Sequence, residues 1–373
     1  MKFVIATQEL NQMINKCLNV IAQKAAIPIL SNLLIEAVGG RLIVTATDLT
    51  VGVRCVADAK ILEEGGTALP GKKLSQLIRE LTAANIEVTT NTHEVTEIVA
   101  NDSRFKLHGM SKNEFPSLPD VTDATLLKMK QGDLKEALQR TAFAVSKDDT
   151  RYSLTGVCMT VQENVATFVG TDGKRLARCH ASVVAEDAFS GSCILPIKAV
   201  DEIAKNLDEE GEVRLFILND KIAIETDSIR IIAKLLAGEY PDVSRVIPES
   251  SALTVNLHRE ELTSLLRQVS LFTNEKEHSV RFTFSPGELR LSANTMEIGE
   301  GRVAMPVSYS GQPLDVAFNP SYFLDILRHT NGETVSLGLI DAFNPGVITE
   351  SDKELAGQAN PLYVLMPLRL KES

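Results

Sequence analysis

Three stretches of the sequence decide the fold: LPGKKLSQLIREL (69–81), LPIKAVDEIAKNL (195–207) and FNPSYFLDILRHT (318–330). Each begins with an apolar residue and a proline or asparagine, where a strand is expected to end. The residues that follow are apolar at the spacing of one face of an α-helix. Leu74 of the first stretch and Val200 of the second are 126 residues apart, and the third stretch follows another 123 residues on. The spacing predicts amphipathic helices at equivalent places in three repeats.

An earlier helix in each repeat and a strand end support the same period. Asp48, Asp172 and Thr295 end apolar strands and are 124 and 123 residues apart. The helix expected before each of them carries one face at spacing 0, 3, 4 and 7, in which only Thr141 is not apolar. The members of this face are Leu10, Met13, Ile14, Cys17, Leu134, Ala137, Leu138, Thr141, Leu262, Leu265, Leu266 and Val269.

Each repeat is itself built from two similar halves. In the first repeat, a strand, a helix from Thr7 and three strands are followed by a strand, a helix from Gly71 and three strands. Short strands with only two helices per repeat predict an α+β fold, in which antiparallel sheets carry both helices on one side. Two proline-marked segments place the boundaries of three similar tandem domains, which are residues 1–121, 122–249 and 250–373.

Composition limits the function classes. Hydrophobic residues make up 44% and charged residues 23% of the 373 residues, as in ordinary globular proteins. The N-terminal MKFVIATQEL becomes polar too early for a signal peptide, so we expect a cytoplasmic protein. Five cysteines without a C-x-x-C pair and six scattered histidines predict neither a disulfide framework nor a metal or cofactor site. No phosphate-binding loop or catalytic triad has the required spacing, so we expect no enzyme.

A tandem array of sheet-bearing domains leaves unpaired strand edges at its two ends. Closing the array into a ring removes those edges, and a head-to-tail dimer would supply enough helices to line a hole as wide as a DNA duplex. The net charge of −11 is compatible with DNA inside, because a topologically linked protein does not need strong phosphate contacts. Cationic residues recur on or beside the expected helices, although each alone also fits an ordinary solvated face. They are Lys16, Lys24, Lys72, Lys73, Arg79, Lys135, Arg140, Lys147, Lys198, Lys205, Arg259, Arg267 and Arg328.

Seven segments of the chain carry a resemblance to one known family. They are IPILSNLLIE (27–36), RYSLTG (151–156), TDGKRLA (171–177), YPDVSRVIP (240–248), TNEK (273–276), FNPSYFLDIL (318–327) and YVLMPLRL (363–370). On these segments the chain resembles the beta sliding clamp of bacterial DNA polymerase III over essentially its whole length. The resemblance implies the DNA clamp fold, with three domains per chain in a head-to-tail dimeric ring whose helices line the hole.

The resemblance also implies a groove for short linear peptides between the second and third domains. The expected groove residues are Leu154, Thr171, Gly173, Lys174, Arg175, Leu176, Pro241, Arg245, Val246, Asn319, Tyr322, Phe343, Val364, Met366, Pro367, Leu368 and Arg369. Their apolar members suit a pocket, and Arg175, Arg245 and Arg369 can hold peptide carbonyls or a carboxylate. Without the resemblance, Leu154 and Leu176 would be read as core residues.

Two further surfaces follow from the resemblance. The residues expected to touch DNA phosphates without reading bases are Lys24, Lys72, Arg151, Tyr152 and Ser153. The dimer interface is expected to contain Lys73, Phe105, Leu107, Leu271, Phe272, Glu297 and Glu300, with Lys73 meeting one of the two glutamates. The chain departs from the family pattern at Ser153, where a second tyrosine can occur, at Glu277, where an aromatic can line the groove, and in the extension 371–373.

The function implied by the resemblance is that of a DNA sliding clamp, the processivity factor of the replicative DNA polymerase. Such a protein encircles duplex DNA without sequence specificity. It tethers the polymerase alpha subunit, the clamp loader, other polymerases and repair proteins through short linear peptides. It is an accessory subunit of a DNA-directed DNA polymerase, without catalysis or cofactor of its own. The alternative is a repeat scaffold that binds peptides but never encloses DNA, which would need neither cationic helices nor a hydrophobic dimer interface.

Overall fold

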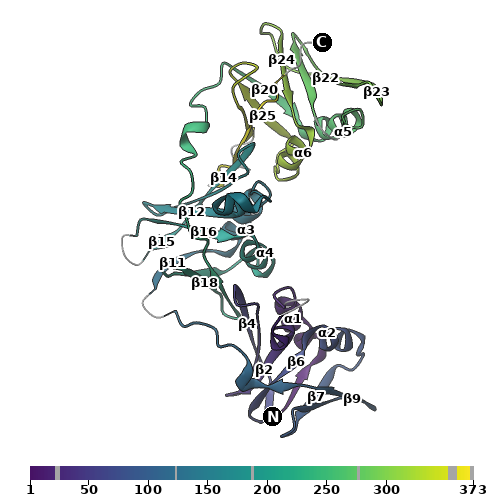
Figure 1. Ribbon diagram of the computed structural model, residues 1–373, viewed down its shortest axis with the longest axis vertical. Coiled ribbons are helices and arrows are strands. Elements are labelled where there is room, and N and C mark those ends of the chain that lie inside the picture. Colours follow the sequence, from purple (N-terminus) through teal and green to yellow (C-terminus); the bar gives the residue numbers. More distant parts are fainter. Residues whose placement is uncertain (22–25, 122–123, 186–188, 275–277, 352–358, 370–373) are drawn as a thin grey trace. The chain divides into compact units, whose positions relative to one another are not determined.

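The computed structural model describes residues 1–21, 26–121, 124–185, 189–274, 278–351 and 359–369, which form two compact units. Unit 1 comprises Met1–Lys135, Val184–Ala188 and Lys198–Leu235. Unit 2 comprises Glu136–Val183, Phe189–Ile197 and Leu236–Ser373. The central part of the sequence therefore contributes to both units (Figure 1).

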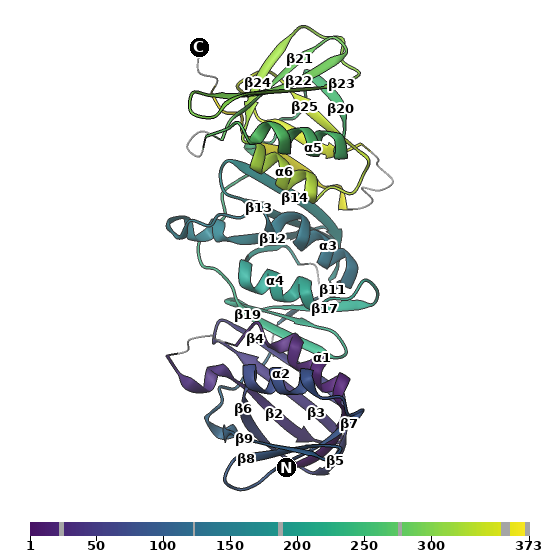
Figure 2. The same ribbon diagram turned by 90° about the vertical axis from the view of Figure 1, so that its right-hand side faces the viewer.

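Unit 1 is built on two antiparallel sheets. The five-stranded sheet has the order β5-β1-β7-β8-β9, and the ten-stranded sheet has the order β10-β6-β2-β3-β4-β19-β18-β17-β11-β15. Helices α1 (Thr7–Cys17) and α2 (Gly71–Glu80) pack side by side against these sheets, and α4 (Ile197–Asn206) belongs to the same unit from its second residue on (Figure 2). The strands are β1 (Lys2–Ala6), β2 (Asn32–Val38), β3 (Arg41–Thr47), β4 (Val51–Asp58), β5 (Lys60–Glu63), β6 (Gly65–Pro70), β7 (Asn85–Thr90), β8 (Val95–Ala100), β9 (Ser103–His108), β10 (Met110–Ser111), β11 (Thr125–Lys130), β15 (Val184–Ala185), β17 (Glu212–Ile217), β18 (Lys221–Glu225) and β19 (Ile229–Lys234).

Unit 2 repeats this construction with an eight-stranded sheet, β16-β12-β13-β14-β27-β26-β25-β20, and a four-stranded sheet, β23-β22-β21-β24. Helices α5 (Arg259–Ser270) and α6 (Pro320–Arg328) pack side by side, and α3 (Gln131–Ala142) begins in unit 1 and ends in unit 2. The strands are β12 (Gly156–Gln162), β13 (Val165–Thr171), β14 (Arg175–Ser182), β16 (Gly191–Pro196), β20 (Leu253–His258), β21 (Val280–Ser285), β22 (Glu288–Thr295), β23 (Gly299–Pro306), β24 (Leu314–Phe318), β25 (Thr334–Leu339), β26 (Gly346–Glu350) and β27 (Leu362–Leu365).

The predicted α+β fold and the predicted helices are confirmed. Helices α1, α3 and α5 are the first helices of the three repeats, and α2, α4 and α6 are the second. The predicted faces of α1, α3 and α5 are buried except for Leu265, which is half-buried. Thr141, the one polar member, is buried because its hydroxyl donates to the carbonyl of Ala137 at 2.7 Å. Among the described helices, none is long and apolar enough to cross a membrane. The sequence did not predict the short strands β5, β10 and β15.

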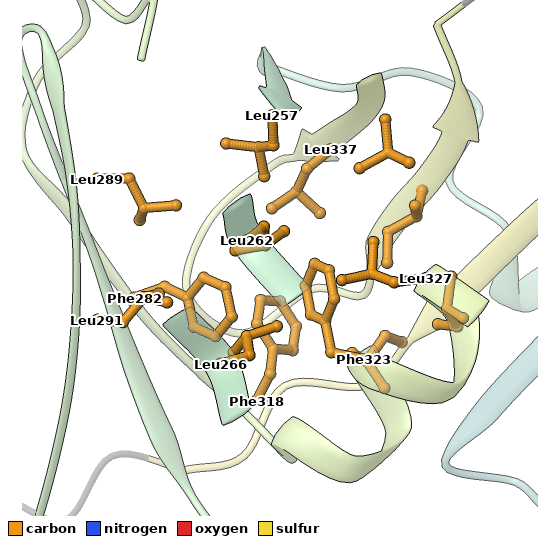
Figure 3. Close-up of a cluster of buried hydrophobic side chains, with 14 of the residues drawn as sticks. Leu257, Leu262, Leu266, Phe282, Leu289, Leu291, Phe318, Phe323, Leu327 and Leu337 are labelled. Atoms are coloured by element: carbon orange, nitrogen blue, oxygen red, sulfur yellow. The ribbon is translucent and has the colours of Figure 1, made fainter. Parts of the chain in front are cut away.

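Aromatic rings and leucines fill the space between the helices and the sheets of unit 2 (Figure 3). Phe282 of β21 meets Phe318 edge-on and stacks on Phe323 of α6, both at 5.3 Å between ring centroids. Leu262 and Leu266 of α5 are fully buried in the same cluster. Burying a leucine or phenylalanine side chain contributes about 1.5–3 kcal/mol, so this cluster holds both helices on the sheets.

Two strand pairings join successive repeats. In unit 1, β4 of the first repeat pairs with β19 of the second, and Val53 lies opposite Ile231. In unit 2, β14 of the second repeat pairs with β27 of the third, and Ala177 lies opposite Tyr363. The compact units therefore cut across the repeats, and the domain boundaries near residues 121 and 249 stay predictions.

Candidate functional site

The turn after β13 shapes the centre of the candidate groove. Asp172 Oδ1 accepts the backbone N–H groups of Lys174 at 2.9 Å and Arg175 at 3.0 Å. Thr171 donates its hydroxyl to the Arg175 carbonyl at 2.6 Å and accepts the Gly173 N–H at 3.1 Å. Gly173 has a φ of +82°, a left-handed conformation that glycine adopts at no steric cost. The turn exposes Lys174 and buries Arg175.

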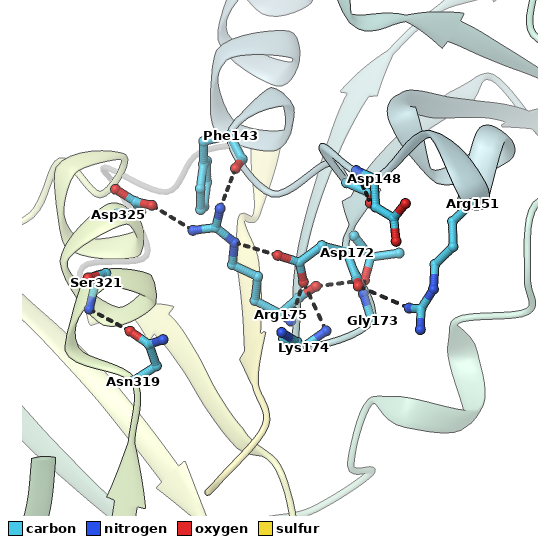
Figure 4. A network of polar contacts seen from close by, with 12 residues as sticks. Phe143, Asp148, Arg151, Asp172, Gly173, Lys174, Arg175, Asn319, Ser321 and Asp325 are labelled. Atoms are coloured by element: carbon cyan, nitrogen blue, oxygen red, sulfur yellow. Dashed lines mark hydrogen bonds and ion pairs between the residues drawn. The ribbon is translucent and has the colours of Figure 1, made fainter. Parts of the chain in front are cut away.

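Arg175 is held by the chain itself (Figure 4). Its Nε lies 3.3 Å from Asp172 Oδ2, Nη1 lies 2.7 Å from Asp325 Oδ2, and Nη2 donates to the Phe143 carbonyl at 2.8 Å. The guanidinium carbon is also 4.5 Å from the ring centroid of Tyr322. Each guanidinium nitrogen of Arg175 already has a partner within the chain, and the expectation that Arg175 also holds a peptide stays a prediction. Arg175 acts as a strut between β14 and α6.

Beside this turn lies an apolar pocket of about 200 Å³. Leu176 and Val364 are buried at its floor, whereas Val246 and Met366 are about 45% and 40% exposed at its rim. The groove residues expected from the sequence that line it are Leu154, Thr171, Gly173, Arg175, Leu176, Pro241, Val246, Val364 and Met366. An apolar floor with an exposed flexible methionine suits a hydrophobic side chain of a bound peptide.

Two residues of this pocket were missed, Asp242 and Val243. Both lie inside the segment YPDVSRVIP, and their position between Pro241 and Val246 was a signal that could have identified them. The pKa of Asp242 is lowered by hydrogen bonds from the hydroxyl and backbone N–H of Ser244, and the carboxylate also accepts Arg245 Nε at 3.1 Å. The rim therefore carries an ionised carboxylate.

A second hollow of about 570 Å³ shares Arg175 with the pocket. Lys174 and Tyr322, both expected in the groove, line this hollow together with Arg151. Its acidic residues are Asp148, Asp172 and Asp325. The two hollows together form a continuous candidate surface around Arg175, which we call the groove; it is apolar at the pocket and charged at the second hollow.

Six other expected groove residues line neither hollow. Asn319 caps α6 by accepting the Ser321 N–H at 2.9 Å, and Leu368 N donates to the Ala317 carbonyl at 2.8 Å. Phe343 is 81% exposed on a turn in which Asp341 accepts its N–H at 2.7 Å. The remaining three are Arg245, Pro367 and Arg369. Glu277 and residues 371–373 lie outside the described part of the chain.

The expected DNA-facing residues fall into two places. Lys72 is exposed on α2, and Arg151 and Tyr152 are exposed in the 3-10 helix Asp149–Thr155, where Ser153 is half-buried. Lys24 lies outside the described residues. Arg151 Nη1 donates to the Asp172 carbonyl at 3.3 Å, so this loop contacts the groove turn.

Not all of the cations on the helices are free to meet a phosphate. Arg140 is buried, with Nη1 2.6 Å from Glu350 and Nη2 2.7 Å from Glu136, so this cation of the helices is already paired within the chain. Lys135 pairs with Glu209 at 2.5 Å, and Lys198 pairs with Asp48. Lys16 is half-buried, whereas the cations of this set that are exposed and have no ion pair to a described residue are Lys72, Lys73, Arg79, Lys147, Lys205 and Arg267.

The expected interface residues lie on β9, on α2, after α5 and at or just before the start of β23. Phe105 and Leu107 are half-buried on β9, the edge of the five-stranded sheet. Leu271 and Phe272 follow α5, and Leu271 is 72% exposed. Lys73, Glu297 and Glu300 are exposed, and Glu300 already pairs with Arg302 at 2.5 Å. The sequence missed Met296 and Ile298, large exposed apolar side chains in the turn before β23.

Comparison with known proteins supports a single class. Models of the DNA polymerase III beta subunit match the chain in three parts: the N-terminal domain over residues 1–119, the central domain over 128–242 and the C-terminal domain over 244–369. A beta sliding clamp of Chlamydia pneumoniae is 50% identical over 372 residues and is covered in full, as is this chain. One of Pseudomonas putida is 31% identical and covers 99% of this chain and 100% of its own length.

Solved structures agree with this class. The DNA polymerase III subunit beta of Pseudomonas aeruginosa superposes with a TM-score of 0.93 at 29% identity, over 99% of this chain and 100% of its own. A second structure from that organism, bound to griselimycin, has a TM-score of 0.94 at the same identity and coverage. Three tandem α+β domains of this kind are the architecture of a DNA clamp. The chain belongs to the DNA polymerase III beta subunit family, whose curated relatives are named beta sliding clamps.

Proposed function

We propose that two copies of this chain close head to tail into a ring around duplex DNA and tether replication and repair proteins through the groove. The beta sliding clamp relatives support the clamp function.

The observation that carries the ring is a strand pairing that occurs twice within the chain. Strands β4 and β14 are equivalent in the repeat, and each pairs antiparallel with the last strand of the following repeat, β19 or β27. The equivalent of β4 and β14 in the third repeat is β23, and the equivalent of β19 and β27 in the first repeat is β9. In the described residues, both β23 and β9 are edge strands. Pairing β23 with β9 of a second copy would repeat the same junction, and two such junctions close a ring.

Side chains beside both edges suit an interface. Leu271 and Met296 are exposed near β23, and Phe105 and Leu107 lie on β9. Exposed apolar side chains beside an unpaired strand edge are unfavourable in a monomer and favourable in a buried junction. This arrangement supports the head-to-tail dimer.

The groove suits peptide partners, and the exposed cations suit DNA. The apolar pocket beside Met366 suits the side chains of short linear peptides, here those of a polymerase alpha subunit, a clamp loader, other polymerases and repair proteins. Lys72, Arg151 and Tyr152 are exposed and suit non-specific phosphate contacts. Such a protein acts in the cytoplasm and performs no catalysis, since nucleotide transfer belongs to the polymerase and ATP hydrolysis to the loader.

A charge introduced at one strand edge tests the ring. Leu107→Asp places a carboxylate in the proposed β9–β23 junction. In analytical sedimentation this variant should have the mass of a monomer, whereas the unaltered protein should have the mass of a dimer. Lys60→Asp is the matched control, because Lys60 is exposed on β5, at the opposite edge of the same sheet. A dimeric Leu107→Asp variant, or a monomeric unaltered protein, would overturn the ring.

A further inference from the structure

A turn in unit 1 reproduces the groove turn of unit 2. Asp48 Oδ1 accepts the N–H groups of Thr50 at 2.8 Å and Val51 at 2.7 Å, as Asp172 does in the groove. Thr47 donates its hydroxyl to the Val51 carbonyl at 3.1 Å and accepts the Leu49 N–H at 3.0 Å. Leu49 has a φ of +76°, although a branched side chain disfavours this left-handed conformation. Strained backbone of this kind is often kept where a site requires it.

The strand beside the turn is also equivalent in the two units. Lys234 N donates to the Thr50 carbonyl at 2.9 Å, and Met366 N donates to the Lys174 carbonyl at 2.9 Å. Lys234 therefore takes the place that Met366 has at the groove rim. The repeat has kept the backbone of the site and changed a rim side chain from apolar to cationic.

Thr47, residues 49–52 and Lys234 line a pocket of about 130 Å³ in unit 1. Its other walls are the segment 116–119, Lys221 and Ile232. Leu118 packs onto Gly52, since a Cβ at Gly52 would lie 2.3 Å from Leu118 Cδ2. Leu118 thus fills space that the side chain of Leu176, the equivalent of Gly52, takes in the groove. The pocket is smaller than its counterpart and keeps an apolar wall.

The rim of this pocket concentrates positive charge. Lys221 of β18 lies directly opposite Lys234 of β19. Like charges at directly opposed positions of two strands repel, and an anion between them would remove that cost. Lys221 Nζ is 3.4 Å from Asp220 Oδ1, and Lys234 is exposed. The described lining of this pocket contains two lysines and no acidic residue, although the chain as a whole has a net charge of −11.

We propose that this pocket is a second docking site, which takes a short acidic peptide carrying one leucine-sized side chain. The apolar side chain would contact Leu49, Leu118 and Ile232, and the carboxylates would lie between Lys221 and Lys234. The site has its own charge preference and does not depend on the groove of unit 2.

The test uses the full-length protein and a fluorescein-labelled pentapeptide, DDLDD, in an anisotropy titration. The unaltered protein should bind the probe, and Lys221→Glu with Lys234→Glu should weaken binding by about tenfold or more, because both charge contacts become repulsive. Lys60→Glu reverses one charge elsewhere in unit 1, and Met366→Ala removes the groove anchor; both variants should bind the probe as the unaltered protein does. The conservative variant Lys234→Met should also weaken DDLDD binding, which keeps the test valid if the double variant fails to fold.

Two outcomes would overturn the proposal. Absence of binding by the unaltered protein would show that there is no such site. Loss of binding in Met366→Ala, with no change in the lysine variants, would place the probe in the groove instead. A control peptide, DDSDD, should bind about tenfold more weakly because it lacks the apolar side chain. Equal binding of the two peptides would also contradict the proposal, because charge attraction alone would then explain the binding.

Discussion

The buried ion pair between Arg140 of α3 and Glu350 of β26 joins residues 210 positions apart, and its removal should destabilise unit 2. The Glu350 side chain is fully buried, and Glu350 Oε1 lies 2.6 Å from Arg140 Nη1 and accepts the Asn331 N–H at 2.8 Å. Burial alone would lower the pKa of Arg140, but the hydrogen bond that Arg140 donates to Glu350 and the nearby negative charge raise this pKa above its ordinary value. The raised pKa keeps the Arg140 guanidinium charged at neutral pH.

Among the described residues, Glu350→Ala leaves the guanidinium with the partly exposed Glu136 as its remaining carboxylate partner. Breaking a buried pair by removing one member costs about 3–5 kcal/mol. In a unit of this size, that loss corresponds to a decrease in melting temperature of roughly 6–20 °C. Calorimetry of the full chain measures it, and Glu350→Gln, which keeps an acceptor for Asn331, should be less destabilising.

The double variant Arg140→Met with Glu350→Leu separates the pair from simple loss of packing. Replacing both charges by apolar side chains of similar volume is often neutral or stabilising, so this variant should melt much closer to the unaltered protein than Glu350→Ala does. A loss below about 1 kcal/mol in Glu350→Ala, or equal losses in the single and double variants, would refute the reasoning.

Three further expectations concern other parts of the chain. Met366→Ala should weaken binding of partner peptides by about 2 kcal/mol in a titration with the unfolding midpoint unchanged, whereas Leu368→Ala should weaken it less, because Leu368 does not line the pocket. Gly52→Ala should lower stability by about 1–3 kcal/mol in calorimetry, because its Cβ would overlap Leu118, and Leu118→Ala in the same chain should restore part of it. Burial lowers the pKa of His180 in the folded chain. The neutral imidazole therefore contributes its full stabilisation above the unfolded pKa of about 6.5. This contribution is lost as the pH falls from there towards the folded pKa. The melting temperatures of His180→Gln and the unaltered protein should therefore converge or cross below pH 6.5, and a pH-independent difference would contradict this assignment.

The repeat made most of the fold predictable, because its period and its helical faces are local properties of the sequence. Even Thr141 occupied its place in the pattern, since its hydroxyl bonds within the helix. Arg140 was not predictable, because its partner Glu350 is far away in the sequence and nothing beside Arg140 marks it as buried. The residues of the proposed dimer interface were expected only through the resemblance, and the apolar turn at Met296 was missed because a lone methionine is no signal by itself.

The groove could be predicted only through the resemblance. Its pocket combines residues near positions 154, 173, 243 and 365, which no spacing rule connects. The resemblance placed Leu176 and Val364 correctly at the pocket but also supplied Phe343 and Leu368, which lie outside it. The contacts of Arg175 with Asp325 and Phe143 could not be predicted from the sequence, because the fold of unit 2 brings these residues together.

The central claim is that the protein holds DNA by enclosing it. The purified protein is loaded with a clamp loader and ATP onto nicked circular DNA, and its retention is measured before and after the circle is cut to linear form. Enclosure predicts retention on circles and loss from linear molecules, because a ring slides off a free end. Equal retention on both forms, or none on either, would contradict enclosure and favour a scaffold that binds peptides without surrounding DNA.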